Sequence, residues 1–345
     1  MRRGWIWAVF LAAFAAEPLT AQQPPPSRPS DLKTEQPPSN PTLNRAEALL
    51  EAGHWKTAHD LLVPWFKNHP AAPDLDRAVF LLARTYYQSG DRVRAFYHLD
   101  ELMDDFPESK FFYPSLELQY QIAIDYLNGY KNSFFGLRIV PGYDEAIEML
   151  FRIQERSPGS PLAEKALRLT ADYYFNSSQF DLAADAYSTF IRSYPRSPDI
   201  PQVKLRQAFS SLAQFRNARL DATPLIDARA QFKALQVQYP EIAAEANAAQ
   251  WIEWIDGQLA RKAYITADFY RRTGKLTGAV FLYRYVVQTY PNSHEAALSR
   301  RDLERMPPWA LRQPPPPQSN PEAAAQALPT ATPPAPAPAS TGKPR

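Results

Sequence analysis

The chain has 345 residues, of which 38 are lysine or arginine and 36 are aspartate or glutamate, so its net charge is +2. This balance, without any basic block or stripe, gives nucleic-acid binding no electrostatic support. Cysteine is absent, so no disulfide can contribute to stability and the fold must depend on packing alone.

The first 21 residues have the pattern of a secretory signal. Two arginines precede an apolar run from Trp5 to Ala16, and small residues lead to Ala21. The apolar run is too short to span a bilayer. We therefore expect residues 1–21 to direct export and to be cleaved near Ala21, with an uncleaved N-terminal anchor as the alternative. No cysteine stands at the cleavage site, so we do not expect lipid attachment there.

Two segments of low complexity flank the rest of the chain. Residues 22–41 and 307–345 are rich in proline, alanine, serine and glutamine, as in "QQPPPSRPS" and "PPAPAPAS". Such segments cannot bury enough apolar surface to offset the entropy of ordering, and their prolines favour an extended polyproline II conformation. We expect disordered spacers. The alternative is a ligand for a proline-binding domain.

Residues 42–306 have the pattern of an all-α domain. They are almost free of glycine, rich in alanine, leucine and aromatic residues, and repeat apolar positions at spacings of three and four. This periodicity predicts helices throughout, without strand-like alternation of any length. A helical stretch of this length is best searched for internal repeats.

Six helix stops share one register. Each stop ends in a proline, which has no amide hydrogen and disfavours helix at the preceding residue. The stops are His69-Pro70, Phe106-Pro107, Ser157-Pro158, Tyr194-Pro195, Tyr239-Pro240 and Tyr290-Pro291. Twelve residues before each proline stands an alanine, in order Ala58, Ala95, Ala146, Ala183, Ala228 and Ala279. The match predicts six units, each with a second helix that ends at the proline.

An earlier alanine marks the first helix of four units. Twelve residues further back stand Ala46, Ala83, Ala171 and Ala267, and a short turn follows each at Gly53, Gly90, Ser178 and Gly274. Glycine lets the chain leave one helix through a left-handed conformation. A small residue on each helix of an antiparallel pair lets the two axes approach closely. Each unit is thus a helix-turn-helix of about 34 residues that needs its neighbours to cover its apolar face.

Units three and five depart from this spacing by insertion. In unit three, Ala123 fits the first helix and "LNGYKNSFFGLRIVPGY" lengthens the turn. In unit five, Ala208 is the small residue and "FRNARLDATPLID" lengthens the turn. Insertions in a repeat array usually form loops on one face, which is often a binding face.

These units resemble the tetratricopeptide repeat, with a small residue, a tyrosine, a glycine turn, an alanine and a final proline. The resemblance is strongest in units two, four and six and looser in units three and five. A narrower resemblance rests on the signal sequence, the "YPxS" endings and the stretches "RLDATPLIDARAQFKALQVQYP" and "LARKAYITADFYRRTGKLTGAVFLYRYVVQTYPNS". In these features the chain is similar to the BamD/ComL (YfiO) family over most of residues 44–295.

The resemblance implies a tetratricopeptide-type α-solenoid of five to six repeats and a non-catalytic periplasmic scaffold in outer-membrane β-barrel assembly. It implies that C-terminal repeats contact a BamA-like insertase and that N-terminal repeats receive segments of unfolded outer-membrane protein clients. The family's acylated cysteine is missing here, and the proline-rich tails are unlike its compact members. We therefore expect an exported, periplasmic protein that lies peripheral to the outer membrane and is held there only through its partners.

Candidate binding residues follow from the helical face that lines the groove of such an array. Positions −3, +1 and +4 from the first-helix alanine share this face. They are Phe80, Arg84, Tyr87, Arg168, Asp172, Phe175, Tyr264, Asp268 and Arg271. Mixed aromatic and charged residues suit an extended or helical peptide; the alternative is that several of them only pack between repeats. The long turn of unit three adds Phe134, Phe135 and Arg138, either as a partner contact or as a plug folded back on the array.

Catalytic and metal sites have no support in the sequence. The five histidines lack the spacing of metal ligands, and no phosphate loop, nucleophile elbow or carboxylate pair suited to acid–base work is present. We expect no cofactor. Two alternatives to the BamD-like scaffold remain. One is another periplasmic repeat adaptor, for example one that coordinates cell-wall synthesis with envelope constriction, and the other is an enzyme that carries a repeat domain.

Overall fold

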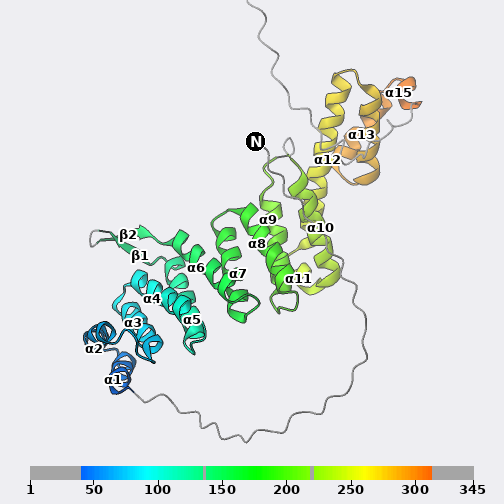
Figure 1. Ribbon diagram of the computed structural model, residues 1–345. Helices are drawn as coiled ribbons and strands as arrows, with labels where there is room; N and C mark the ends of the chain where they lie inside the picture. Colours follow the sequence, from blue (N-terminus) through cyan, green and yellow to red (C-terminus); the bar gives the residue numbers. More distant parts are fainter. Residues whose placement is uncertain (1–39, 135–136, 218–220, 313–345) are drawn as a thin grey trace, which may run out of the picture. The chain divides into compact units, whose positions relative to one another are not determined.

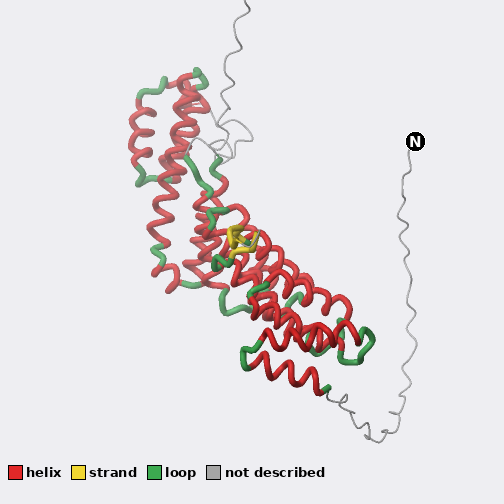
Figure 2. The backbone as a smooth tube through the Cα atoms, turned by 90° about the vertical axis from the view of Figure 1, so that its left-hand side faces the viewer, coloured by secondary structure: helices red, strands yellow, loops and turns green. Residues whose placement is uncertain are grey.

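The computed structural model describes residues 40–134, 137–217 and 221–312. In this part of the chain, helices follow one another as antiparallel pairs (Figures 1 and 2). The pairs are α1 (Pro41–Glu51) with α2 (Trp55–Asn68), α3 (Leu75–Ser89) with α4 (Arg92–Asp105), α5 (Phe112–Leu127) with α6 (Tyr143–Arg156), α7 (Pro161–Asn176) with α8 (Phe180–Ser193), α9 (Ile200–Ala213) with α10 (Thr223–Gln238), and α12 (Ala248–Arg272) with α13 (Leu276–Thr289). Each pair packs on the next in chain order, which confirms the all-α class and the repeat register.

The alanines of the repeat register lie where the helices cross. All of them are 0 % exposed: Ala46, Ala58, Ala83, Ala95, Ala123, Ala146, Ala171, Ala183, Ala208, Ala228, Ala267 and Ala279. A larger side chain there would push the helix axes apart. The spacing of small residues that was read from the sequence is therefore the spacing of helix–helix contacts.

The short turn inside each regular pair runs through the left-handed region. Gly90 has φ +87° and donates its backbone N–H to the carbonyls of Tyr86 and Tyr87. In unit four the non-glycine residue Ser178 takes this position with φ +62°. The turn thus needs a positive φ more than it needs glycine.

The residues that follow the proline stops form a connector between one helix pair and the next. Each predicted stop residue caps the C-terminus of its helix, as Tyr194 does for α8. In the link after α8, the backbone N–H of Ser197 donates to the carbonyl of Tyr194 at 3.1 Å, and the Ser197 hydroxyl then accepts the N–H of Asp199. The same backbone bond recurs at Ser109, Ser160 and Ser293, at 3.0 to 3.1 Å. Recurrent endings such as "YPRS" are therefore a closed connector between consecutive pairs.

The core of the described residues follows the pairs as four clusters of mostly aromatic and aliphatic side chains. The largest fully buried rings are Tyr126, Tyr187, Phe190, Phe232 and Tyr283. The biggest cluster extends from α9 to α15 (Pro308–Arg312) and includes residues of α11 (Pro240–Glu245) and α14 (His294–Glu304). No helix in the described ranges is both long and apolar enough to cross a membrane.

The prediction of helices throughout was wrong in the long turn of unit three. Strands β1 (Lys131–Phe134) and β2 (Leu137–Pro141) pair antiparallel there, with an irregularity between Asn132 and Ser133. The β-branched residues Ile139 and Val140 favour strand, and the run is too short for a helical period to be seen. This hairpin sits between α5 and α6 and leaves the helix pair intact.

Candidate protein-binding surfaces

The predicted face of unit two largely joins helices to one another. Phe80 stacks on Phe111 at the start of α5, with ring centroids 5.0 Å apart. The Arg92 guanidinium lies 3.9 Å from the centre of the Tyr87 ring and also donates to Asp125 on α5 at 2.8 Å. Burial, followed by the nearby Asp125 carboxylate, raises the pKa of Tyr87. These contacts hold α3 against α4 and α5.

Arg84 lies on the same helix face as Phe80 and Tyr87 and is partly exposed. Its guanidinium is the candidate in this unit that is best placed to meet a partner, since the two aromatic side chains are engaged in packing.

Unit four repeats this arrangement with a network of charges. Asp172 accepts a hydrogen bond from the Tyr187 hydroxyl at 2.6 Å and pairs with Arg168 at 3.3 Å. Arg168 reaches on to Asp199 at 2.6 Å. Burial and the Asp172 hydrogen bond raise the pKa of Tyr187. The network therefore ties α7 to α8 and to the start of α9.

Phe175 completes the predicted face of unit four. It lies edge-on to Phe180, with centroids 5.7 Å apart, and Arg206 of α9 lies 5.1 Å from its ring centre. Because Arg206 also faces Asp172 at 3.9 Å, the same arginine contacts two of the three predicted residues. Phe175 thus contributes to packing between pairs.

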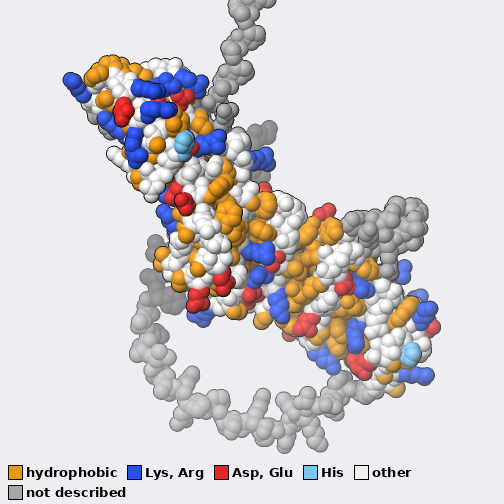
Figure 3. Space-filling view, turned by 180° about the vertical axis from the view of Figure 1, so that it is seen from behind, with side chains coloured by type: hydrophobic (Ala, Val, Ile, Leu, Met, Phe, Trp, Pro, Cys, Tyr) orange, Lys and Arg blue, Asp and Glu red, His pale blue; other side chains and the backbone are white. Residues whose placement is uncertain are grey.

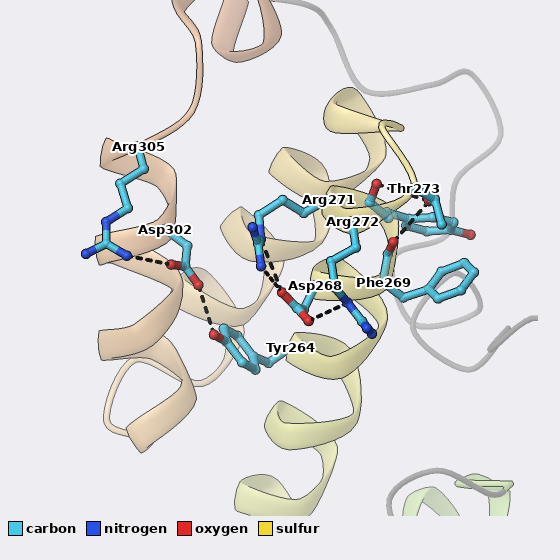
Figure 4. A network of polar contacts seen from close by, with 9 residues as sticks. Tyr264, Asp268, Phe269, Arg271, Arg272, Thr273, Asp302 and Arg305 are labelled. Carbon is cyan, nitrogen blue, oxygen red and sulfur yellow. Dashed lines mark hydrogen bonds and ion pairs between the residues drawn. The ribbon is translucent and has the colours of Figure 1, made fainter.

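The predicted residues of unit six lie close together in a polar network (Figure 4). The Tyr264 hydroxyl donates to Asp302 of α14 at 2.9 Å, and Arg305 lies 3.9 Å from the other Asp302 oxygen. Burial, followed by the hydrogen bond to Asp302, raises the pKa of Tyr264 to about 12. The network joins α12 to α14.

Asp268 lies one turn further along α12 and forms ion pairs with two arginines. Arg271 contacts it at 2.5 Å and Arg272 at 3.0 Å (Figure 4). Both arginines are exposed, so their pairing with Asp268 neutralises only part of the positive charge. Arg271 is accordingly the most accessible of the three residues predicted in this unit.

The residues predicted from the long turn fall in or beside the hairpin. Phe134 pairs with Leu137, and Arg138 pairs with Ser133, in the β1–β2 register. Phe135 lies outside the described residues. Whether these residues contact a partner or plug the array stays a prediction.

Positive charge is concentrated at the C-terminal end. Residues 260–312 contain ten basic and four acidic residues, whereas residues 40–259 contain 22 basic and 28 acidic residues. Figure 3 shows the lysine and arginine side chains gathered over this end. We define the basic C-terminal surface by its exposed residues Arg271, Arg272, Lys275, Arg301, Arg305 and Arg312. The balanced net charge of the whole chain concealed this asymmetry.

A second surface that sequence reasoning missed is aromatic. Trp251 and Trp254, on the first turns of α12, are 36 % and 44 % exposed. Trp254 borders a hollow of about 590 Å³ beside the end of α9. The signal was present as two tryptophans three residues apart in "WIEW", on a helix of which half the buried residues are alanine.

Another hollow of about 590 Å³ lies between the first half of α12 and the turn from α13 to α14, with both acidic and basic side chains in its lining. Across the described part of the chain, no group of three or more histidine, cysteine or acidic side chains is placed to hold a metal ion.

Comparison with known families agrees with the repeat architecture. Residues 77–109, which span most of α3 and all of α4, match a tetratricopeptide repeat family. Residues 139–306, which run from β2 through α14, match the YfiO family, described as "Outer membrane lipoprotein".

Individual relatives are distant. Outer membrane protein assembly factor BamD of Caulobacter vibrioides is 20 % identical over 148 residues, which cover 43 % of this chain and 48 % of that protein. BamD of Rickettsia prowazekii is 20 % identical over 154 residues, which cover 45 % of this chain and 61 % of that protein. The matched region thus spans about half to three fifths of the curated relatives.

Among solved structures, a tetratricopeptide repeat protein of Parabacteroides merdae is 12 % identical, with 77 % of this chain and 91 % of that chain covered and a TM-score of 0.34. A thermophilic repeat protein of Thermus thermophilus is 18 % identical, with 61 % and 97 % covered and a TM-score of 0.28. The helix pairs, the closed connectors and the two family matches lead to one conclusion: the chain is a tetratricopeptide-repeat protein that resembles the BamD family of outer-membrane assembly factors.

Proposed function

We propose that the chain is a non-catalytic periplasmic scaffold that binds partner and client proteins during the assembly of outer-membrane β-barrels. The observation that carries the proposal is the YfiO match over residues 139–306. It covers the second helix of unit three, the helix pairs of units four to six and most of the basic C-terminal surface. The signal-like residues 1–21 support export, and binding to partners would hold the protein beside the outer membrane.

Binding would use a surface that is already formed. Most of the predicted groove residues hold consecutive pairs together, so the binding surface is already ordered in the folded array. The conformational entropy of these side chains is lost on folding and not on binding. The basic C-terminal surface suits a partner domain with an acidic face, because complementary charge speeds and orients association. We assign this surface to a BamA-like insertase. The N-terminal pairs, with the partly exposed Arg84, would receive client segments.

The test is a crosslinking pull-down from envelope fractions with the full chain as bait. Wild type should recover a BamA-like insertase. The variant Arg301→Glu/Arg305→Glu should recover at least tenfold less, since two charges on the basic C-terminal surface are reversed. The matched control Arg192→Glu/Arg196→Glu changes the same charge on exposed residues of unit four and should behave as wild type.

Recovery of cell-wall synthases alone would contradict the proposal and favour an adaptor for envelope constriction. Equal recovery of the insertase by both charge variants would retain the scaffold but remove the basic C-terminal surface from the interface. Raising the salt concentration should weaken insertase recovery with wild type, because exposed charges are screened.

A further inference from the structure

The aromatic surface of α12 is larger than one exposed side chain. Trp251 and Trp254 meet edge to face, with ring centroids 6.4 Å apart. Phe209 contacts Trp251 at 5.8 Å, and Phe215 contacts Trp254 at 6.1 Å. Both phenylalanines come from α9 or its end, so two pairs contribute to one surface. Clustered and exposed aromatic rings of this kind usually mark a binding site.

The hollow beside this cluster is lined by an unusual set of side chains. Its lining consists of Phe215, Arg216, Asn217, Trp254, Gln258, Arg261 and Ile265. Every polar residue in this set can donate hydrogen bonds through a guanidinium, a carboxamide or an indole N–H, and none carries a carboxylate. The hollow thus combines aromatic faces with a surplus of donors.

A proline-rich segment has the complementary chemistry. Proline lacks a backbone N–H, so a run of prolines presents carbonyl acceptors without donors, and its rings pack on aromatic side chains. In the polyproline II conformation the backbone makes no internal hydrogen bonds, and its carbonyls remain available. Such a segment would satisfy both features of the hollow.

We infer that the hollow binds a proline-rich segment and that its occupant is residues 313–322 of the same chain, "QPPPPQSNPE". This segment follows directly on α15, whose Leu311 carbonyl accepts a hydrogen bond from Arg284 of α13 at 2.8 Å. Helix α13 packs in turn on α12. Ten residues extend over about 30 Å at 3.1 Å per residue, and they begin on the α13 side of α12, the helix that supplies Trp254, Gln258, Arg261 and Ile265 to the hollow.

Charge and chain position favour this occupant over the N-terminal proline-rich segment. Glu322 is the one acidic residue after Arg312, and it would follow the proline run toward the exposed Arg216 and Arg261. The N-terminal prolines instead precede α1, which packs on α2 and α3 at the other end of the helix order. The inference goes beyond the proposed function and does not depend on it, since it concerns two parts of one chain.

The test is hydroxyl-radical footprinting of the full chain, read by mass spectrometry at individual residues. The variant Pro314→Ser/Pro315→Ser/Pro316→Ser/Pro317→Ser should oxidise at least threefold more at Trp251 and Trp254 than wild type. Tyr97, which is 65 % exposed in unit two, serves as the internal reference and should not change. Because the substitutions lie after α15, circular dichroism should show the same helix content.

A matched control replaces four N-terminal prolines, Pro24→Ser/Pro25→Ser/Pro26→Ser/Pro29→Ser, and should leave both tryptophans protected. A synthetic peptide of residues 313–322 added to the C-terminal variant should restore protection, and a peptide with serine in place of proline should not. Equal oxidation in wild type and both variants would overturn the inference. Protection that disappears on dilution, with a dimer in size-exclusion chromatography, would overturn it in favour of a second copy as the source.

Discussion

Replacing the crossing alanine of unit five, Ala228→Leu, tests the packing argument most directly. Ala228 is 0 % exposed in α10, where it belongs to the cluster shared with α9 and α12. Leucine adds three carbon atoms at a position where the existing methyl group is fully buried. The helix axes or their neighbours must therefore move, and overpacking of this kind typically costs about 1–3 kcal/mol.

We expect a value near the upper end of that range, because α10 packs on its partner α9, on α11 and on α12 of the next pair. For a chain of this size each kcal/mol lowers Tm by roughly 2–4 °C. A loss of about 3 kcal/mol corresponds to a fall in Tm of about 6–12 °C. Hydrogen exchange in α10 and α12 should accelerate more than in α3, since repeat arrays respond locally.

The same change made at an exposed position of the same helix is the control. Ala234 lies six residues further along α10 and is exposed, so Ala234→Leu should alter stability by less than about 0.5 kcal/mol. Thermal unfolding followed by circular dichroism measures both variants. Equal melting temperatures for the two leucine variants would refute the claim that the repeated alanines set the helix spacing.

Three further outcomes follow from the structure. The pKa of Tyr264 is raised to about 12 in the folded chain, whereas an unfolded tyrosine has a pKa near 10. The stabilisation by its protonated hydroxyl is therefore complete below pH 10 and should be lost as the pH rises to 12. Tm should fall over this range of pH, and the fall should be smaller in Tyr264→Phe. Gly53 has φ +78° with open space around it, so Gly53→Ala should cost about 1 kcal/mol, whereas Gly257→Ala within α12 should gain about 0.5–1 kcal/mol in chemical unfolding. Tyr187→Phe removes the 2.6 Å hydrogen bond to Asp172 and should cost about 1–2 kcal/mol, and Asp172→Ala should cost more because Arg168 and Arg206 also lose their partner.

The repeat architecture could be predicted because it depends on single positions with strict requirements. A crossing helix tolerates only a small residue, so Ala58 and Ala183 carry the register without any knowledge of their neighbours. Proline ends a helix through its own covalent structure, so Tyr194-Pro195 marks a boundary by itself. Such signals are local, and they remain readable in units three and five, where the turns are longer.

The surfaces were harder to predict because each depends on partners from several helices. Phe80 and Tyr87 share a face with Arg84, yet only the structure shows that rings and charges from α4 and α5 engage them. Lys262 is 2 % exposed, and burial lowers its pKa while Asp221 opposes the shift. A lysine on a helix is ordinarily assigned to solvent, so its burial against another pair could not be read from periodicity.

The two kinds of junction in the array differ in what they tolerate. The connector after α4, α6, α8 and α13 is closed by a backbone hydrogen bond at a serine, as between Tyr194 and Ser197, so its length fixes the rotation from one pair to the next. The turn within a pair joins helices that already hold each other through their alanines. Both natural insertions, at 128–142 and 214–222, lie in the turn between the two helices of one pair. A fluorescent protein or affinity tag grafted into the Gly90 turn should therefore leave the array in phase, whereas one grafted at Ser197 should divide it into two independently moving halves.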